Sequence, residues 1–151
     1  PLIACWPRGI AARGELRHTV GHVIDVVPTL LDLTGAAWPG RVKGQPVPAS
    51  PGRSLVQTLA GDGPILHDDL WWYHDEHKAL RKGYWKLVSS KGEPWQLYHL
   101  GRDRTEMRNL SESMPEKVQE LAKRWDQRAA EFKVLALQGA AEKARKPRKK
   151  K

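Results

Sequence analysis

The sequence is informative first through what it lacks. Its 151 residues contain a single cysteine, Cys5, which excludes an internal disulfide framework and a zinc site built from several cysteines. No apolar run approaches the roughly 20 residues that a membrane-spanning helix needs, and no secretory signal pattern is found at the start. The chain begins at Pro1, directly on an apolar run, and this abrupt start predicts that an upstream part is missing.

The net charge is small over most of the chain, and the excess of basic residues is concentrated at its end. The net charge is +9, of which residues 1–142 carry only +2. The last nine residues hold seven basic side chains, which are Lys143, Arg145, Lys146, Arg148, Lys149, Lys150 and Lys151. Residues 139–151 have too little to bury and are predicted to be a disordered basic tail. Such a tail binds nucleic acid, anionic lipid or sulfated polysaccharide, although most charge runs are simply solvated.

Residues 78–100 show the clearest pattern of regular structure. Apolar residues recur at every second position, and Lys82-Gly83 and Lys91-Gly92 interrupt the pattern. This alternation predicts two or three β-strands joined by tight turns, with Trp85 and Leu87 on one face. A sheet with one apolar face needs a cover. The expected cover is an amphipathic helix at about 114–135, in which Trp125 packs on the sheet.

The remaining elements are predicted from end signals and short patterns. Residues 1–6 resemble a buried strand, and Asp25 suits the N-cap of a helix over 26–33 that Gly35 closes. The proline-rich stretch 36–53 predicts a surface loop. Three further elements are expected: a short helix at 54–60 with Ser54 as its cap, a strand within 65–73, and a capping box of Ser113 and Glu116 at the start of the last helix. On that helix, Glu120 and Arg124 have the spacing of an ion pair.

Four segments together resemble the C-terminal part of type I sulfatases, a family related in core fold to alkaline phosphatase. Residues 1–7 resemble "VPLI…WPG", and residues 25–35 resemble "D-x-x-P-T-L-L-x-L-A-G". Residues 52–55 resemble "G-x-S-L". The fourth segment, residues 79–87 with 95–98 and 103–110, resembles "A-x-R-x-G-x-W-K-L" followed by "E-L-Y-D-L-x-x-D-x-x-E-x-x-N-L". Each segment is weak alone, but their order and intervals are specific. The basic tail lies outside the resemblance.

The resemblance implies an α+β fold with three parts. Residues 1–60 would be the end of the sulfatase α/β core, contributing one strand, one helix and a Pro/Gly-rich loop. Residues 61–138 would be a small antiparallel β-sheet packed against a C-terminal α-helix, and 139–151 the basic tail. Members of this family are often exported, so a periplasmic or secreted location is also an implication of the resemblance.

The resemblance also implies chemistry that these residues do not carry. Sulfatases hydrolyse sulfate esters with a formylglycine made from C/S-x-P-x-R and a divalent cation, usually calcium. The sequence contains no such motif: Cys5 precedes Trp6-Pro7-Arg8, without the residue between proline and arginine. No catalytic or metal-binding residue is therefore assigned, and neither cofactor is expected in this part. On a strand, Asp68 and Asp69 would point to opposite faces and could not easily share one ion.

Histidines and tryptophans are the remaining site candidates. His74 and His77 flank Asp75-Glu76 in a polar bend, where the family can contact the group that carries the sulfate; they are either substrate-binding residues or exposed turn residues. His18 and His22 are expected to pack or to cap a helix, whereas His67 and His99 have no pattern of a ligand. Four tryptophans could form a sugar platform, but sheet packing is the expected role; they are Trp71, Trp72, Trp85 and Trp95.

Two functions follow as hypotheses. The first is the C-terminal part of a sulfuric ester hydrolase, which braces the core, forms part of the substrate cleft for a sulfated small molecule or polysaccharide, and is inactive alone. The alternative is a non-catalytic module that binds polyanions through the basic tail. The two differ in salt dependence, because binding by the tail would weaken steeply as salt rises.

Overall fold

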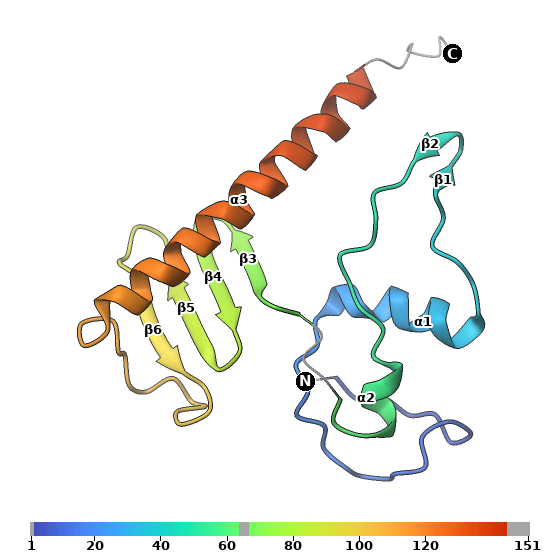
Figure 1. Ribbon diagram of the computed structural model, residues 1–151, viewed down its shortest axis with the longest axis horizontal. Helices are drawn as coiled ribbons and strands as arrows, with labels where there is room; N and C mark the ends of the chain where they lie inside the picture. The colour runs from blue at the N-terminus through green and yellow to red at the C-terminus, as the bar shows by residue number, and fades with distance from the viewer. Residues whose placement is uncertain (1, 64–66, 145–151) are drawn as a thin grey trace. The chain divides into compact units, whose positions relative to one another are not determined.

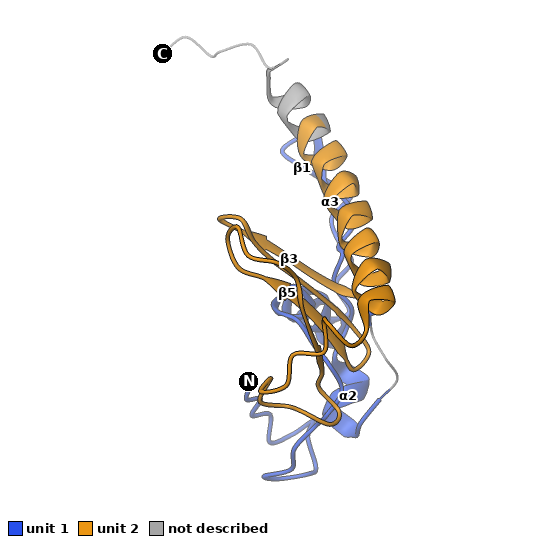
Figure 2. Cartoon of the chain, turned by 90° about the vertical axis from the view of Figure 1, so that its left-hand side faces the viewer, with its two compact units in different colours: residues 1–68 blue, residues 69–151 orange. Residues whose placement is uncertain are grey.

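A computed structural model describes residues 2–63 and 67–144, with side chains described as far as residue 137. The chain forms two compact units, Pro1–Asp68 and Asp69–Lys151 (Figure 2). Each unit is described by itself below. The three-part division expected from the sequence, with boundaries after residues 60 and 138, stays a prediction.

The first unit consists of short elements joined by long loops. A 3₁₀ turn, η1 (Val23–Asp25), leads into helix α1 (Val26–Thr34), and Gly35 ends α1 in the left-handed conformation with φ 68°. A small hairpin pairs β1 (Arg41–Val42) with β2 (Gln45–Pro46), and helix α2 (Val56–Ala60) follows. The expected helix over 26–33 is confirmed, since Gly35 supplies the αL residue that closes many helices.

Two sequence expectations in this unit are wrong, and a third, the N-cap at Asp25, is right in position but not in its side-chain bond. Residues 2–6 form no strand, and Leu2 and Ile3 are 69% and 91% exposed, because no described segment offers them a strand partner. Asp25 occupies the N-cap position but makes no side-chain cap bond, since its carboxylate is used elsewhere. The first turn of α2 starts at Leu55 rather than Ser54, although the Ser54 hydroxyl still accepts a bond from the Val56 N–H at 3.2 Å.

The second unit is built on a four-stranded antiparallel sheet in the order β3-β4-β5-β6. Its strands are β3 (Leu70–His74), β4 (His77–Lys82), β5 (Trp85–Ser89) and β6 (Gln96–His99) (Figure 1). Consecutive strands pair, so each connection is a hairpin, and Gly83 takes φ 59° in the tight turn between β4 and β5. The strands predicted around the two Lys-Gly breaks are confirmed.

Helix α3 (Pro115–Ala144) lies along one face of this sheet and continues past it (Figures 1 and 2). The core between helix and sheet consists of Leu80, Leu87, Leu97, Leu121 and Trp125. Three of these leucines are aligned across β4, β5 and β6 by the strand register. Burial of each such side chain contributes about 2–3 kcal/mol, so this row holds the helix on the sheet as the alternation predicted.

The helix differs from expectation at both ends. It begins at Pro115, and the Ser113 hydroxyl donates to the Leu110 carbonyl at 3.1 Å, a different contact from the predicted capping box. It also continues to Ala144 instead of ending near residue 135. The added residues are mostly Ala, Leu, Gln, Glu and Lys, which are strong helix formers and outweigh the single Gly139. Residues 145–151 of the predicted tail lie outside the described residues.

The expected packing of the tryptophans is largely confirmed. Trp71, Trp85 and Trp95 are partly buried against the core, and the Trp125 indole stacks on Trp71 with ring centroids 5.5 Å apart. The Trp125 indole N–H donates to the Trp72 carbonyl at 3.1 Å. The chain as a whole is an α+β structure, as the sequence predicted.

Candidate functional site

The two histidines predicted to contact substrate lie together at the tip of one hairpin. His74 ends β3, His77 begins β4, and the two residues are directly paired in the strand ladder. Both are exposed. Because opposite residues of an antiparallel pair project from the same face, with Cβ atoms about 5 Å apart, the two imidazoles lie side by side on one face of the sheet.

The turn between these histidines is strained. Asp75 and Glu76 have φ 47° and 67°, a left-handed conformation that Asp adopts more readily than most L-residues but that is uncommon for Glu. The Lys91 ammonium lies 3.2 Å from the Glu76 carboxylate and 4.0 Å from that of Asp75. Strained backbone concentrates at functional sites, so this turn is a candidate site on local geometry as well as on residue type.

The histidine pair belongs to the face of the sheet that α3 does not cover. The register pairs Trp72 with Ala79 and Leu70 with Arg81, and side chains alternate along a strand. Trp72 and Arg81 therefore share the face of the histidines. The neighbouring residues Trp71 and Leu80 are the ones that pack against α3. This side is called the α3-free face below. It is not uniformly exposed, because Leu70 and Tyr98 on it are 6% and 8% exposed.

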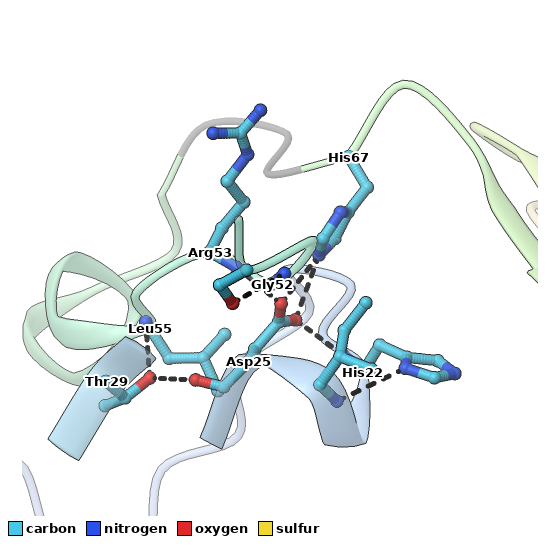
Figure 3. A network of polar contacts seen from close by, with 9 residues as sticks. His22, Asp25, Thr29, Gly52, Arg53, Leu55 and His67 are labelled. Carbon is cyan, nitrogen blue, oxygen red and sulfur yellow. Dashed lines mark hydrogen bonds and ion pairs between the residues drawn. The ribbon is translucent and has the colours of Figure 1, made fainter. Parts of the chain in front are cut away.

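A second polar centre lies in the first unit, around a fully buried carboxylate (Figure 3). Asp25 is 0% exposed. Its Oδ2 atom accepts from the His22 backbone N–H at 2.7 Å, and Oδ1 accepts from the Arg53 backbone N–H at 2.8 Å. The Nε2 atom of His67 lies 2.8 Å from Oδ1 and 3.0 Å from Oδ2. One side chain thus joins three segments that are far apart in the sequence.

Thr29 and Gly52 bring the loop 52–55 closer to the backbone around Asp25. The Thr29 hydroxyl donates to the Asp25 carbonyl at 2.6 Å and accepts from the Leu55 backbone N–H at 2.9 Å (Figure 3). At Gly52 a Cβ atom would lie 2.0 Å from the Ile24 carbonyl oxygen, so only glycine allows this close approach of two backbones. The resemblance to "D-x-x-P-T" and "G-x-S-L" therefore falls on residues that fasten the loop 52–55 to α1.

Sequence reasoning missed His67 because its partner is 42 residues away, and no local spacing connects them. The prediction for His22 is confirmed, since its Nδ1 atom accepts from the Ile24 N–H at 3.3 Å as a cap. The backbone N–H of His18 donates to Asp62 at 2.5 Å. The bond from His18 and a second from Thr19 lower the pKa of the Asp62 carboxyl.

Asp68 and Asp69 have different environments. Asp68 is exposed, whereas the Asp69 side chain is 2% exposed and pairs with Arg124 at 2.6 Å and Arg128 at 2.7 Å. Burial opposes ionisation of Asp69, but the hydrogen bonds from Arg128 and Arg124 outweigh it and lower the pKa of Asp69. The predicted pair of Glu120 and Arg124 is replaced by this contact and by Glu120 with Lys117.

The described residues hold no group of three or more His, Cys, Asp and Glu side chains that could bind a metal ion. The carboxylates of Asp25 and Asp69 already accept from several donors. Cys5 is exposed. None of the helices within residues 2–63 and 67–144 has both the length and the apolar character to cross a bilayer.

Comparison with known proteins assigns this architecture. The family model described as N-sulphoglucosamine sulphohydrolase, C-terminal, matches residues 1–134. An uncharacterized sulfatase of Schizosaccharomyces pombe is 29% identical over 110 residues, covering 68% of this chain and 20% of that protein. Arylsulfatase K of Xenopus laevis is 27% identical over 139 residues, covering 82% of this chain and 24% of that protein. The chain thus spans about a quarter or less of these relatives.

Solved structures show the same fold. A Bacteroides thetaiotaomicron protein, described with the metabolism of multiple glycosaminoglycans, has a TM-score of 0.53 and 22% identity, covering 68% of this chain and 24% of its own. A protein solved in complex with its substrate D-glucosamine-2-N,6-O-disulfate has a TM-score of 0.50 and 21% identity, covering 73% of this chain and 24% of its own. At 21–22% sequence identity, these similarities are evidence for a shared fold and not for a shared function.

In sequence order the chain has α1, then the four-stranded sheet, then α3 on one face of that sheet. Together with the family match, this arrangement identifies the chain as a C-terminal region of the sulfatase class. The chain belongs to the N-sulphoglucosamine sulphohydrolase C-terminal family. The match ends at residue 134, within α3. The distal turns of that helix and the basic residues after it lie beyond the matched part.

Proposed function

We propose that this chain acts as the C-terminal part of a sulfatase that hydrolyses a sulfate ester to an alcohol and inorganic sulfate. Its own residues brace the core of the enzyme and form part of the substrate cleft. The nucleophile and the metal ligands belong to the rest of the enzyme. Family membership over residues 1–134 and the small share of each relative that the chain covers support this proposal.

The observation that carries the bracing role is the exposed apolar side of the first unit. In α1 the only buried residue is Thr29, while Val27, Leu30 and Leu33 are 51%, 56% and 38% exposed. A single amphipathic helix is stable mainly through the burial of its apolar face. A larger sulfatase core is the partner that suits this face, because relatives have about three quarters of their length outside the matched region.

His74 and His77 are proposed to contact the group that carries the sulfate. Imidazole N–H groups donate hydrogen bonds to anionic oxygens, and a protonated ring adds charge. The side chains are exposed and adjacent at the tip of a strained turn, so they can reach a ligand without repacking the sheet.

Calcium and formylglycine are the groups that the family implies. The carboxylates described here do not fit a calcium site, because such an ion needs six to eight oxygen ligands, and Asp25 and Asp69 are engaged with other donors. Both groups are therefore assigned to the rest of the enzyme.

Assays of the chain with and without its upstream reading frame test this proposal. The 151-residue chain should not turn over an aryl sulfate in the presence of calcium, whereas a protein extended upstream into a C/S-x-P-x-R motif should. Calcium-dependent turnover by the chain alone would contradict the proposal. In the extended enzyme, His74→Ala and His77→Ala should each raise KM several-fold. His18→Ala is the matched control, because the His18 backbone and not its ring carries the hydrogen bond to Asp62.

The second candidate function is polyanion binding by the basic tail. The observation in its favour is the density of charge, with seven basic residues among the last nine. Neutralising several phosphates or sulfates makes affinity fall steeply with salt. Deletion of residues 143–151 should abolish such binding to heparin or to nucleic acid, and binding that survives the deletion or ignores salt would reject this function.

A further inference from the structure

The outer side of α3, which faces away from the sheet, changes from polar to apolar where the helix runs past the sheet (Figure 1). Leu121 and Trp125 pack inward, so residues three and four apart on the opposite side form the outer row. As far as residue 127 this row is polar and exposed. From Ala130 onward it continues with Val134 and Leu137, which are also exposed. The polar residues of the row are Glu116, Gln119, Lys123 and Gln127.

The inward side of the same distal turns is apolar as well. Phe132 still contacts Trp71, with ring centroids 5.0 Å apart, but it is 42% exposed, and Leu135 is 56% exposed. On the outer side, Val134 and Leu137 are 54% and 61% exposed. Four large apolar side chains are therefore exposed within six consecutive residues. A contiguous exposed apolar patch of this kind marks an interaction site.

The charges next to this patch are positive. Within residues 130–137 the charged side chains are Glu131 and Lys133, and Glu131 is paired with Arg128 at 2.9 Å. Lys133 has a long aliphatic stem, which can lie on an apolar surface while its ammonium reaches a polar layer. Seven basic residues follow among the last nine of the chain. An apolar helical segment is thus directly succeeded by a dense positive charge.

We propose that residues 130–151 attach the protein to the surface of an anionic lipid bilayer. The apolar side chains of residues 132–137 enter the boundary between headgroups and acyl chains, and the basic residues of 143–151 bind anionic headgroups. This mode of binding is peripheral, and the polar outer row upstream of Ala130 stays in water. The inference deepens the second candidate function, because it names the polyanion and adds an apolar contact that the tail alone does not make.

Other occupants of this segment satisfy only part of its chemistry. A nucleic acid or a sulfated polysaccharide would bind the basic residues, but it would leave the exposed apolar side chains in water. A second copy of the segment would bring another seven basic residues close to the first set, and like charges oppose such pairing. A bilayer with anionic lipids offers an apolar layer and negative charge together. Because α3 lies on the other side of the sheet from the α3-free face, this attachment does not use His74 or His77.

Flotation of the full chain with lipid vesicles tests the attachment. Phosphatidylcholine vesicles with and without phosphatidylglycerol are compared at physiological salt, and retention on heparin is measured in parallel. The wild type should float with the vesicles that contain phosphatidylglycerol and not with pure phosphatidylcholine. Replacement of the seven basic residues by glutamine should abolish both vesicle binding and heparin retention.

A double substitution separates the apolar contact from the charge. Leu135→Gln combined with Leu137→Gln should weaken binding to anionic vesicles more than about tenfold and leave heparin retention unchanged. Glutamine is a strong helix former, and far-UV circular dichroism checks that α3 is intact. The matched control is Leu16→Gln combined with Met107→Gln, at positions 78% and 85% exposed outside α3, which should leave vesicle binding unchanged.

Three outcomes would overturn the attachment while leaving polyanion binding by the tail intact. They are heparin retention without vesicle binding, vesicle binding that ignores the double substitution in α3, and an equal loss in the control pair. The second candidate function fails separately, if the wild type is retained by neither heparin nor nucleic acid at physiological salt. The vesicle and heparin results therefore distinguish an error about the bilayer from an error about the tail.

Discussion

The two units of the chain are stabilised by different interactions. The second unit has a contiguous apolar core of four leucines and Trp125 between sheet and helix. The first unit has Leu55 as its one buried apolar residue among those described, and its buried side chains otherwise include Asp25, Thr29 and Thr58. Hydrogen bonds to the carboxylates of Asp25 and Asp62 connect its loops.

This difference separates a part with its own apolar core from a part whose buried contacts are mainly polar. Apolar burial is non-directional and sums over area, so the sheet and α3 form an independent core. A polar network has directed contacts but contributes only about 1 kcal/mol per net hydrogen bond. The first unit is therefore held mainly by the hydrogen bonds of Asp25 and Asp62. The apolar side chains of α1 remain exposed, where the proposed sulfatase core would cover them.

The largest expected effect in this comparison comes from Asp25→Ala. The substitution leaves three partly buried donors without an acceptor, which costs about 3–5 kcal/mol in total. Hydrogen exchange should speed up in residues 15–63 and stay unchanged in residues 70–137. Asp25→Asn is the matched control, because it retains one acceptor oxygen and should cost less. Unchanged protection of the first unit would show that the network is not what holds it.

Leu87→Ala tests the core of the second unit. Leu87 is 0% exposed, and removal of a fully buried leucine side chain costs about 3–4 kcal/mol. Five of the seven tryptophans lie in this unit, so fluorescence during urea unfolding reports mainly on it. Leu137→Ala, at a position 61% exposed, should change stability by less than about 0.5 kcal/mol. Similar losses for both variants would contradict the assigned core.

Asp69→Asn addresses the ion pairs of the buried Asp69 carboxylate with Arg124 and Arg128. Breaking a buried ion pair by removing one partner costs about 3 kcal/mol, and somewhat less is expected because the arginines are partly exposed. The folded-state pKa of Asp69 is lowered. Its contribution is therefore complete above the unfolded pKa of about 4 and is lost as pH falls further, through the folded pKa.

The urea midpoints of the wild type and Asp69→Asn should accordingly differ at pH 7. The difference should shrink as pH falls below about 4 and vanish only below the lowered folded pKa of Asp69. The exposed neighbour provides the control, since Asp68→Asn should leave the midpoint unchanged at either pH. If the urea midpoints of the wild type and Asp69→Asn still differ in acid, Asp69 stabilises the unit through packing and not through its charge.

The smallest effect is expected at the histidine turn. Lys91→Ala removes ion pairs with Asp75 and Glu76 whose side chains are 59% to 72% exposed, and exposed pairs contribute about 0.5 kcal/mol or less. The unfolding midpoint should hardly move, and added salt should reduce even this change. A larger loss would mean that Lys91 supports the strained turn as a structural element.

The sequence was most predictive where structure is local and periodic. Alternation around Lys82-Gly83 predicted β4 and β5, and the apolar spacing that includes Trp125 predicted a helix covering the sheet. It also placed His74 and His77 in one bend, and the structure adds that they are paired across a ladder. The binding role of these histidines stays a prediction.

Long-range polar contacts could not be predicted in this way. The side chain of Asp25 has the position of a helix cap in sequence, but a buried acceptor binds the donors that tertiary structure brings to it, here Arg53 and His67. Arg124 has an acid four residues earlier, yet it binds Asp69, which is 55 residues away. Burial strengthens such pairs, and burial is decided by the whole fold.

The continuation of α3 to Ala144 gives the basic segment a defined starting point. An α-helix rises about 1.5 Å and turns about 100° per residue, so the ten residues after the family match advance the backbone by about 15 Å. Insertion or deletion of a single alanine in these turns would rotate the start of the basic segment by more than a quarter of a circle. The side of the helix axis on which α3 ends is therefore set by residue count, which evolution can change in one step without altering the sheet or its core.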